Sequence, residues 1–177
     1  ARFQELLDWF NAANESVPLV QSVVLDREEY GWVEFAKFAS CTTSAEVSRF
    51  YYRMGAYLAI LYSLKSVDFH AENLIAVGEY PMLIDMETLF HTHFASTEAT
   101  GANQLAEKKV QSSVLEIGML PQRIWGNQQG VGVDVSGLGA PRKQPSPRRT
   151  LVWEFPGTDK MQASYQYVDF EMNAQNR

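Results

Sequence analysis

The fold of this chain depends most on two neighbouring stretches, Val67-Asp68-Phe69-His70-Ala71-Glu72-Asn73 and Leu83-Ile84-Asp85-Met86-Glu87-Thr88. The apolar segments Leu74–Val77 and Met82–Ile84 lie around a Gly78-Glu79-Tyr80-Pro81 turn, which predicts two short strands. A hairpin of this length returns the chain to the segment that precedes it. We therefore expect Asp68, Asn73 and Asp85 to lie close together.

These side chains are the ones that phosphoryl transfer from ATP requires. One carboxylate must orient the attacking hydroxyl or accept its proton, and a second must hold the magnesium ions, often beside an amide oxygen. Asp68 and Asn73 have the Asp-x-x-x-x-Asn spacing of a kinase catalytic loop, and Asp85 supplies the second carboxylate. Because loops are rich in Asp and Asn, a purely structural loop network is the alternative. The preceding helix and the following hairpin favour the functional interpretation.

Three further polar residues accompany this set, and the pattern leaves their roles open. His70 contacts the transferring phosphate or the substrate hydroxyl, or else only orients Asp68. Glu72 and Glu87 flank the metal-binding residues, and they either support the metal site or are ordinary loop acids.

A long amphipathic helix is predicted before the loop, from about residue 44 to residue 65. Thr43 and Glu46 have the spacing of a capping box. Residues then recur every three or four positions along one stripe: Val47, Phe50, Tyr51, Met54, Leu58, Leu61, Tyr62 and Lys65. We expect this stripe to face the core, with Gly55, Ala56 and Ala59 allowing close packing. A kinase C-lobe supports its catalytic loop with such a helix.

The rest of the chain gives shorter elements. Residues 2–13 predict an amphipathic helix, while Val20–Leu25, Trp32–Phe38 and Leu151–Phe155 predict strands. We expect one face of Trp32–Phe38 to be buried. We also expect His91–Ala106 to be a loop, Val110–Leu120 and Gly130–Val135 to be extended, and the Gly/Pro-rich Gly137–Pro147 to be mobile.

Composition and charge narrow the class of protein. The chain has 177 residues, 46% hydrophobic and 20% charged, which is typical of a globular protein. Its net charge of −6 argues against nucleic-acid binding. The single cysteine, Cys41, excludes an internal disulfide framework and favours a cytoplasmic protein. No apolar run approaches the roughly 20 residues of a transmembrane helix, and we expect no signal peptide.

Several short segments follow one another in the order found in a known protein family. They are Tyr30–Phe35, Tyr51–Ala56, Asp68–Ile75, Leu83–Phe90, Ser113–Leu115, Gly118–Pro121, Asp134–Gly139 and Gly157–Met161. Together they resemble the dehydratase domain of class II lanthipeptide (lantibiotic) synthetases. The resemblance covers most of residues 20–161.

That resemblance implies a fold related to lipid kinases and an enzyme that uses ATP and Mg²⁺. The family phosphorylates Ser and Thr in a ribosomal precursor peptide and then eliminates the phosphate, which leaves dehydroalanine and dehydrobutyrine. A zinc-dependent cyclase domain adds cysteine thiols to these alkenes. By resemblance, Asp68 is the catalytic aspartate and His70 its companion. Asn73 and Asp85 would bind magnesium, with Glu87 close by in the cofactor site.

The resemblance also implies that parts of the active enzyme lie outside residues 1–177. Lys37 lies where the hinge is expected, so no lysine for the ATP phosphates can be assigned. The earlier phosphate-elimination residues are expected upstream of residue 1, and the Arg…Thr elimination motif expected after Met161 is not found. We therefore expect a fragment that does not carry out full dehydration alone. Its expected partners are the precursor peptide and a C-terminal cyclase domain of the same protein.

We predict an α+β, protein- or lipid-kinase-like fold in which the whole chain is part of one dehydratase domain. Residues 1–40 would form the end of the N-lobe and the hinge. Residues 41–177 would form the C-lobe core with the catalytic loop and an activation-loop-like segment. One alternative is a small-molecule phosphotransferase of the aminoglycoside or choline kinase type, against which Tyr30–Phe35 and the long insert after Phe90 argue. The other is a non-catalytic, peptide-binding pseudokinase, which has no need of the Asp68, Asn73 and Asp85 set.

Overall fold

The structure is a computed structural model that describes residues 2–14, 17–91, 101–124, 132–141, 143–146 and 148–171. This part of the chain contains the helices α1 (Arg2–Ala13), α2 (Ser44–Ser63) and α3 (Ala102–Gln111) and the 3₁₀ helices η1 (Ala71–Asn73), η2 (Met86–Thr88) and η3 (Val114–Ile117). Its strands are β1 (Val24–Asp26), β2 (Gly31–Val33), β3 (Leu74–Val77), β4 (Tyr80–Leu83), β5 (Arg123–Ile124), β6 (Val133–Asp134), β7 (Lys143–Pro145), β8 (Thr150–Glu154), β9 (Gln162–Gln166) and β10 (Asp169–Glu171).

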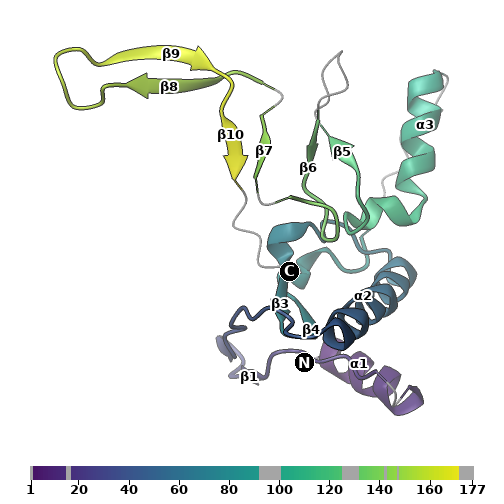
Figure 1. Ribbon diagram of the computed structural model, residues 1–177. Helices are drawn as coiled ribbons and strands as arrows, with labels where there is room; N and C mark the ends of the chain where they lie inside the picture. Colours follow the sequence, from purple (N-terminus) through teal and green to yellow (C-terminus); the bar gives the residue numbers. More distant parts are fainter. Residues whose placement is uncertain are drawn as a thin grey trace.

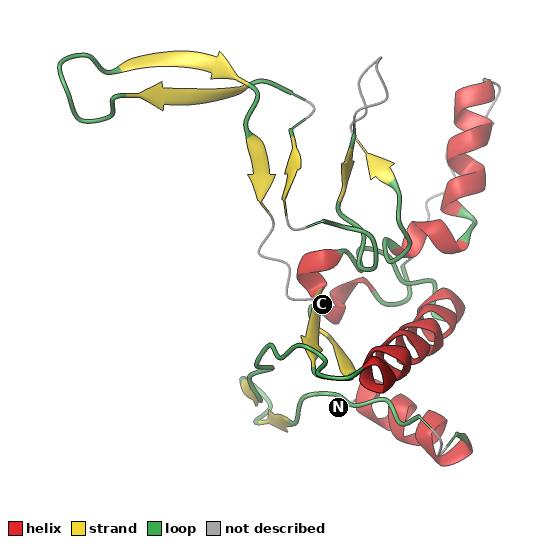
Figure 2. Ribbon diagram, viewed as in Figure 1, coloured by secondary structure: helices red, strands yellow, loops and turns green. Residues whose placement is uncertain are grey.

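The strands form antiparallel pairs, each of two strands: β1–β2, β3–β4, β5–β6, β8–β9 and β7–β10. Helices α1 and α2 lie at one end of the molecule with the β3–β4 hairpin, and the β8–β9 hairpin projects away from the other end (Figure 1). Colouring by secondary structure shows that helices and small sheets are mixed along the chain, which makes it an α+β structure (Figure 2). The kinase-like fold stays a prediction. Among the described residues, no helix has the length and apolar character that crossing a membrane requires.

Helix α2 begins where the capping box predicted. The Thr43 side chain accepts a hydrogen bond from the Glu46 amide, and the Glu46 carboxylate accepts one from the Thr43 amide, so two free donors at the helix end are satisfied. The helix ends after Ser63, two residues before the predicted end.

The buried face of α2 differs in part from the predicted stripe. Its buried residues are Phe50, Arg53, Met54, Tyr57 and Leu61. Val47, Tyr51 and Tyr62 are exposed, so their prediction as core residues is wrong. The expectation of close packing at Gly55 is also wrong, because a Cβ added there would meet no atom within 4 Å. The buried face is therefore shifted around the helix, because it includes Arg53 and Tyr57, which the predicted stripe lacked.

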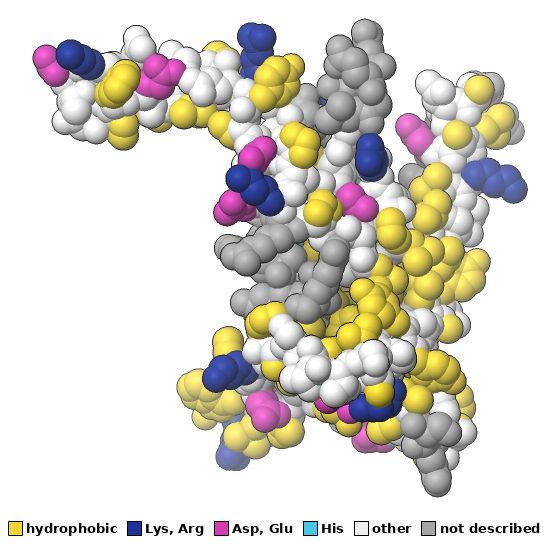
Figure 3. Space-filling view, viewed as in Figure 1, with side chains coloured by type: hydrophobic (Ala, Val, Ile, Leu, Met, Phe, Trp, Pro, Cys, Tyr) yellow, Lys and Arg dark blue, Asp and Glu magenta, His cyan; other side chains and the backbone are white. Residues whose placement is uncertain are grey.

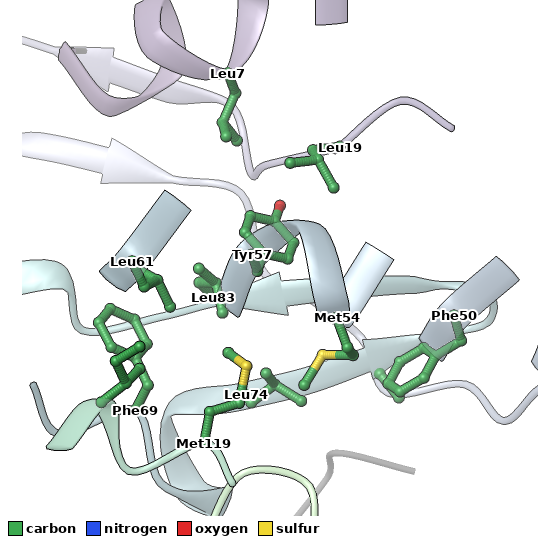
Figure 4. Packing of buried hydrophobic residues seen from close by; sticks show 12 residues of the cluster. Leu7, Leu19, Phe50, Met54, Tyr57, Leu61, Phe69, Leu74, Leu83 and Met119 are labelled. Carbon is green, nitrogen blue, oxygen red and sulfur yellow. The ribbon is translucent and has the colours of Figure 1, made fainter. Parts of the chain in front are cut away.

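The core gathers side chains from α1, α2, the β3–β4 hairpin and the loop between α2 and β3 (Figure 4). Its buried members are Leu7, Leu19, Phe50, Met54, Tyr57, Leu61, Phe69, Leu74, Ala76, Leu83, Ile117 and Met119. The Tyr57 hydroxyl donates a 3.0 Å hydrogen bond to the Val20 carbonyl, which satisfies the polar end of a buried ring.

A buried arginine joins α2 to the hairpin turn. Arg53 is 3% exposed and donates to the Pro18 carbonyl, the Glu79 carbonyl and the Glu79 carboxylate, at 2.9, 2.9 and 2.7 Å. Arg49 makes a second ion pair with Glu79. These two guanidinium groups, Arg49 above all, lower the pKa of Glu79 to about 2. The network holds the hairpin against the helix that precedes the loop.

The first hairpin is shorter and more exposed than predicted. Leu25 pairs with Trp32, as a turn at 26–31 requires, but the strands span only Val24–Asp26 and Gly31–Val33. Trp32 is 67% exposed and Phe35 is 85% exposed, so the predicted buried face of Trp32–Phe38 is wrong. Apolar side chains are visible on this hairpin in the space-filling view (Figure 3). No other described element packs on the strands to cover them.

The structure also differs from several predictions for the part of the chain after residue 90. Helix α3 begins at Ala102 inside the predicted His91–Ala106 loop, and Val110–Leu120 forms the end of α3 and η3 rather than an extended segment. Within Gly137–Pro147, predicted to be mobile, Ala140 and Gln144 are buried. The predicted strand Leu151–Phe155 is confirmed as β8. Residues 92–100, 130–131, 142 and 147 of these segments lie outside the described residues.

Candidate functional site

The loop that carries Asp68 lies between the end of α2 and β3. Where the chain leaves α2, the Ser66 amide donates a 3.0 Å hydrogen bond to the Leu61 carbonyl, which fixes the start of the loop. Phe69 is 1% exposed and anchors the loop in the core, while the Asp68 side chain is 59% exposed. The Asp68 carboxylate is therefore exposed to solvent, while the next residue, Phe69, fixes the loop to the core.

Two later segments support the backbone of this loop. The Phe69 amide donates to the Ile117 carbonyl at 2.8 Å, and the Ala71 amide donates to the Val135 carbonyl at 2.9 Å. A Cβ on Gly137 would lie 2.8 Å from the Phe69 carbonyl oxygen, closer than packing permits. A Cβ on Gly118 would lie 3.3 Å from the Phe69 amide nitrogen, a tight contact, and the φ of +81° at Gly118 also favours glycine. Sequence reasoning gave no role to either glycine, because the support depends on long-range contacts.

The β3–β4 hairpin returns the chain to the loop, as predicted. The Ile84 amide donates to the Asn73 carbonyl at 3.0 Å, and the Thr88 hydroxyl donates to the Val67 carbonyl at 2.5 Å. These two hydrogen bonds attach the segment 84–88 to the two ends of the Asp68–Asn73 loop. Asp85 lies between them in the sequence. The structure therefore brings Asp85 to the same part of the molecule as Asp68 and Asn73.

His70 is held by the backbone two residues further on. Its Nδ1 atom accepts a hydrogen bond of 3.2 Å from the Glu72 amide, so in the neutral ring the proton lies on Nε2. Nε2 lies 3.7 Å from Oδ1 of Asp68. His70 thus faces Asp68, which fits the interpretation that it orients this carboxylate.

Asn73 is oriented by Asp68. Its Nδ2 atom donates to the Asp68 carbonyl at 2.9 Å, and a carbonyl only accepts, so the amide orientation is fixed. No hydrogen bond to the Oδ1 atom of Asn73 is found in the described part of the chain. That oxygen is available to a ligand.

Asp85 begins η2 with a left-handed backbone, φ 55° and ψ 66°, and its side chain makes no capping hydrogen bond. Asp85 and Glu87 are exposed, and neither makes an ion pair with another described residue. Glu72 is exposed as well. The carboxylate of Asp85 is therefore free to bind a cation.

The oxygen donors at this place fit Mg²⁺. The described residues hold no cluster of three or more His, Cys, Asp or Glu side chains that could bind a metal alone. Mg²⁺ usually takes only one or two protein carboxylates and completes its shell with water and substrate phosphates. One carboxylate from Asp85 and one amide oxygen from Asn73 match that kind of site, with Glu87 nearby in the sequence.

A model of a known protein family, described as a domain of unknown function (DUF4135), matches residues 1–177. The chain belongs to this family. The DUF4135 match includes every residue of the site described above.

The chain is also similar to a curated protein, "Lacticin 481/lactococcin biosynthesis protein LcnDR2" of Lactococcus lactis subsp. lactis. The two sequences are 34% identical over 115 residues, which is 64% of this chain and 12% of that protein. The chain thus spans a small part of the length of this relative.

Proposed function

We propose that this DUF4135 chain is part of a kinase-like dehydratase that acts in lanthipeptide biosynthesis. The proposed enzyme uses ATP and Mg²⁺ to phosphorylate Ser and Thr in a precursor peptide, and it then eliminates the phosphate. The observation that carries the proposal is the hairpin that attaches Asp85 to both ends of the Asp68–Asn73 loop. Similarity to a lacticin biosynthesis protein supports the choice of a peptide as substrate.

In the first step, Asp68 would orient the substrate hydroxyl. Its exposed carboxylate accepts the hydroxyl proton as the oxygen bonds to the γ-phosphorus. The bond from this phosphorus to the bridging oxygen breaks, and ADP leaves. His70 would hold the Asp68 carboxylate in position through the Nε2 atom that faces it.

Asn73 and Asp85 would hold the cation beside this carboxylate. A bound Mg²⁺ would supply the positive charge that offsets the negative charge developing on the nucleotide phosphates. The two polar atoms of the Asn73 side chain have different roles. The nitrogen donates to the Asp68 carbonyl, and the oxygen is left for the cation.

The second step forms the alkene. A base removes the Cα proton of the phosphorylated residue, the electrons of that bond form the Cα=Cβ double bond, and the Cβ–O bond breaks to release phosphate. Asp68, His70, Asn73 and Asp85 act in phosphoryl transfer. We propose no residue from the described part of the chain as the base for this elimination.

Mass spectrometry of a Ser- and Thr-containing precursor peptide tests the proposal. The full-length protein is incubated with the peptide, ATP and Mg²⁺, and with EDTA in place of Mg²⁺ as the control. We expect phosphorylated and dehydrated peptide only with Mg²⁺. Phosphorylation of an aminoglycoside or choline, but not of the peptide, would instead identify a small-molecule phosphotransferase.

A further inference from the structure

Asp68 has an unusual backbone, and both of its neighbouring peptide groups are held by side chains. Its φ angle is 66°, in the left-handed region. The carbonyl before it, on Val67, accepts a 2.5 Å hydrogen bond from the Thr88 hydroxyl. The carbonyl after its Cα, its own, accepts a 2.9 Å hydrogen bond from the Asn73 amide.

These two hydrogen bonds stabilise a conformation that is otherwise unfavourable. A non-glycine residue in the left-handed region costs about 1–2 kcal/mol, although Asp tolerates it better than most residues. Rotation of Asp68 to an ordinary φ angle would turn its two peptide groups relative to each other. Both carbonyls could not then keep their donors, so Thr88 and Asn73 together favour the observed direction of the Asp68 side chain.

Thr88 also belongs to the segment that carries Asp85. It lies at the end of η2, the 3₁₀ helix that Asp85 begins. The neighbouring attachments join backbone to backbone, from the Phe90 amide to the Leu64 carbonyl and from the Ile84 amide to the Asn73 carbonyl, both at 3.0 Å. The Thr88 hydroxyl, by contrast, is a side-chain attachment that a substitution can remove while the chain path is kept.

We propose that Thr88 is a positioning residue that couples the direction of Asp68 to the placement of Asp85. This inference rests on the proposed phosphoryl transfer. Thr88 touches neither nucleotide nor peptide, and it acts through the Val67 carbonyl. The reaction needs the aspartate that orients the hydroxyl and the aspartate that holds the cation at a fixed separation, and displacements near 1 Å cost about 100-fold in such reactions.

Three variants of the full-length protein test this role: Thr88→Val, which removes the hydroxyl at nearly constant volume; Thr88→Ser, which keeps it; and Thr42→Val. Thr42→Val is the matched control, because it removes a 2.9 Å hydroxyl bond to Glu46 at the opposite end of α2. We expect Thr88→Val to lower kcat for peptide phosphorylation by about 10- to 100-fold, with the KM for ATP within about twofold. Thr88→Ser should restore most of kcat, and Thr42→Val should leave it unchanged. A kcat of Thr88→Val equal to that of Thr42→Val would overturn the inference.

A second measurement does not require activity. Hydrogen–deuterium exchange of the peptide that covers residues 67–73 reports the amides of Phe69 and Ala71, which bind Ile117 and Val135. We expect faster exchange there in Thr88→Val only, and unchanged exchange would contradict the inference. The variants Asp68→Asn and Asp85→Asn separate the two proposals. If both are inactive while Thr88→Val is normal, the proposed function stands and the role of Thr88 is wrong; if both are active, the proposed function is wrong.

Discussion

The side-chain amide of Asn73 donates a 2.9 Å hydrogen bond to the main-chain carbonyl of Asp68. This bond closes the loop between the two residues whose spacing defines the kinase-like pattern. The bond explains the spacing of the pattern. Asn73 must lie near enough for its side-chain nitrogen to bind the backbone of Asp68, while the side-chain oxygen of Asn73 is left for a ligand. An aspartate at residue 73 would supply an oxygen but no donor.

Asn73→Asp is therefore expected to lower the rate of peptide phosphorylation even though an oxygen ligand remains. If loss of this exposed hydrogen bond raises the barrier by about 1.4 kcal/mol, kcat falls roughly tenfold. Initial rates of ADP release in the presence of peptide measure the effect. Asn14→Asp, the same exchange at the end of α1, should behave as wild type. An unchanged rate for Asn73→Asp would show that the hydrogen bond to Asp68 does not matter.

Gly137→Ala should displace the catalytic loop. The added Cβ would lie 2.8 Å from the Phe69 carbonyl oxygen, and this backbone atom must shift to make room. We expect a loss of about 1–3 kcal/mol in unfolding free energy, as in other overpacked sites, and reduced phosphorylation. Gly55→Ala is the control. It adds a methyl group in open space on α2 and should stabilise the protein by about 0.5–1 kcal/mol, with normal activity. Urea denaturation of both variants measures the change in unfolding free energy. A gain for Gly137→Ala or a loss for Gly55→Ala would contradict the prediction.

Arg53→Met should destabilise the protein far more than Arg49→Met. Arg53 is 3% exposed and is the donor to the carbonyls of Pro18 and Glu79, which lose these hydrogen bonds when the guanidinium is removed. We expect a loss of about 3 kcal/mol for Arg53→Met. Arg49 is 44% exposed, so water can replace it and the expected change is small. Equal losses in urea denaturation would contradict this ordering.

The stability of the protein should fall in acid in part because of Glu79. Hydrogen bonds from Arg49 and Arg53 lower the pKa of its carboxyl from 4.5 to about 2 in the folded protein. A lowered folded-state pKa stabilises the fold above the unfolded-state value, and this contribution disappears as the pH falls from about 4.5 to about 2. Chemical denaturation across this range should show a weaker pH dependence for Glu79→Gln than for wild type. Parallel curves for the two proteins would rule out this role of Glu79.

Local patterns in the sequence were sufficient for several features of the fold. Thr43 and Glu46 predicted the start of α2, because a capping box depends only on neighbours within one helical turn. The apolar runs around Gly78 predicted the β3–β4 hairpin, although the turn is shorter than expected and Tyr80 already belongs to β4. These same two elements place the Asp68 loop and return Asp85 to it.

Features that depend on distant contacts could not be predicted in this way. Trp32 has the apolar character of a core residue, yet no described element covers it. The sequence does not predict helix α3, because the helix is polar overall and none of its residues is buried. The roles of Gly137 and Thr88 depend on contacts with Phe69 and Val67, which are far away in the sequence.

In the proposed reaction, Asp85 holds the cation used for peptide phosphorylation. The mass spectrum of the precursor peptide after incubation with ATP, Mg²⁺ and full-length Asp85→Asn protein tests this role. Asp8→Asn, an exposed carboxylate on α1, is the matched control. We expect unmodified peptide with Asp85→Asn and dehydrated peptide with Asp8→Asn. Normal dehydration by Asp85→Asn would contradict this role.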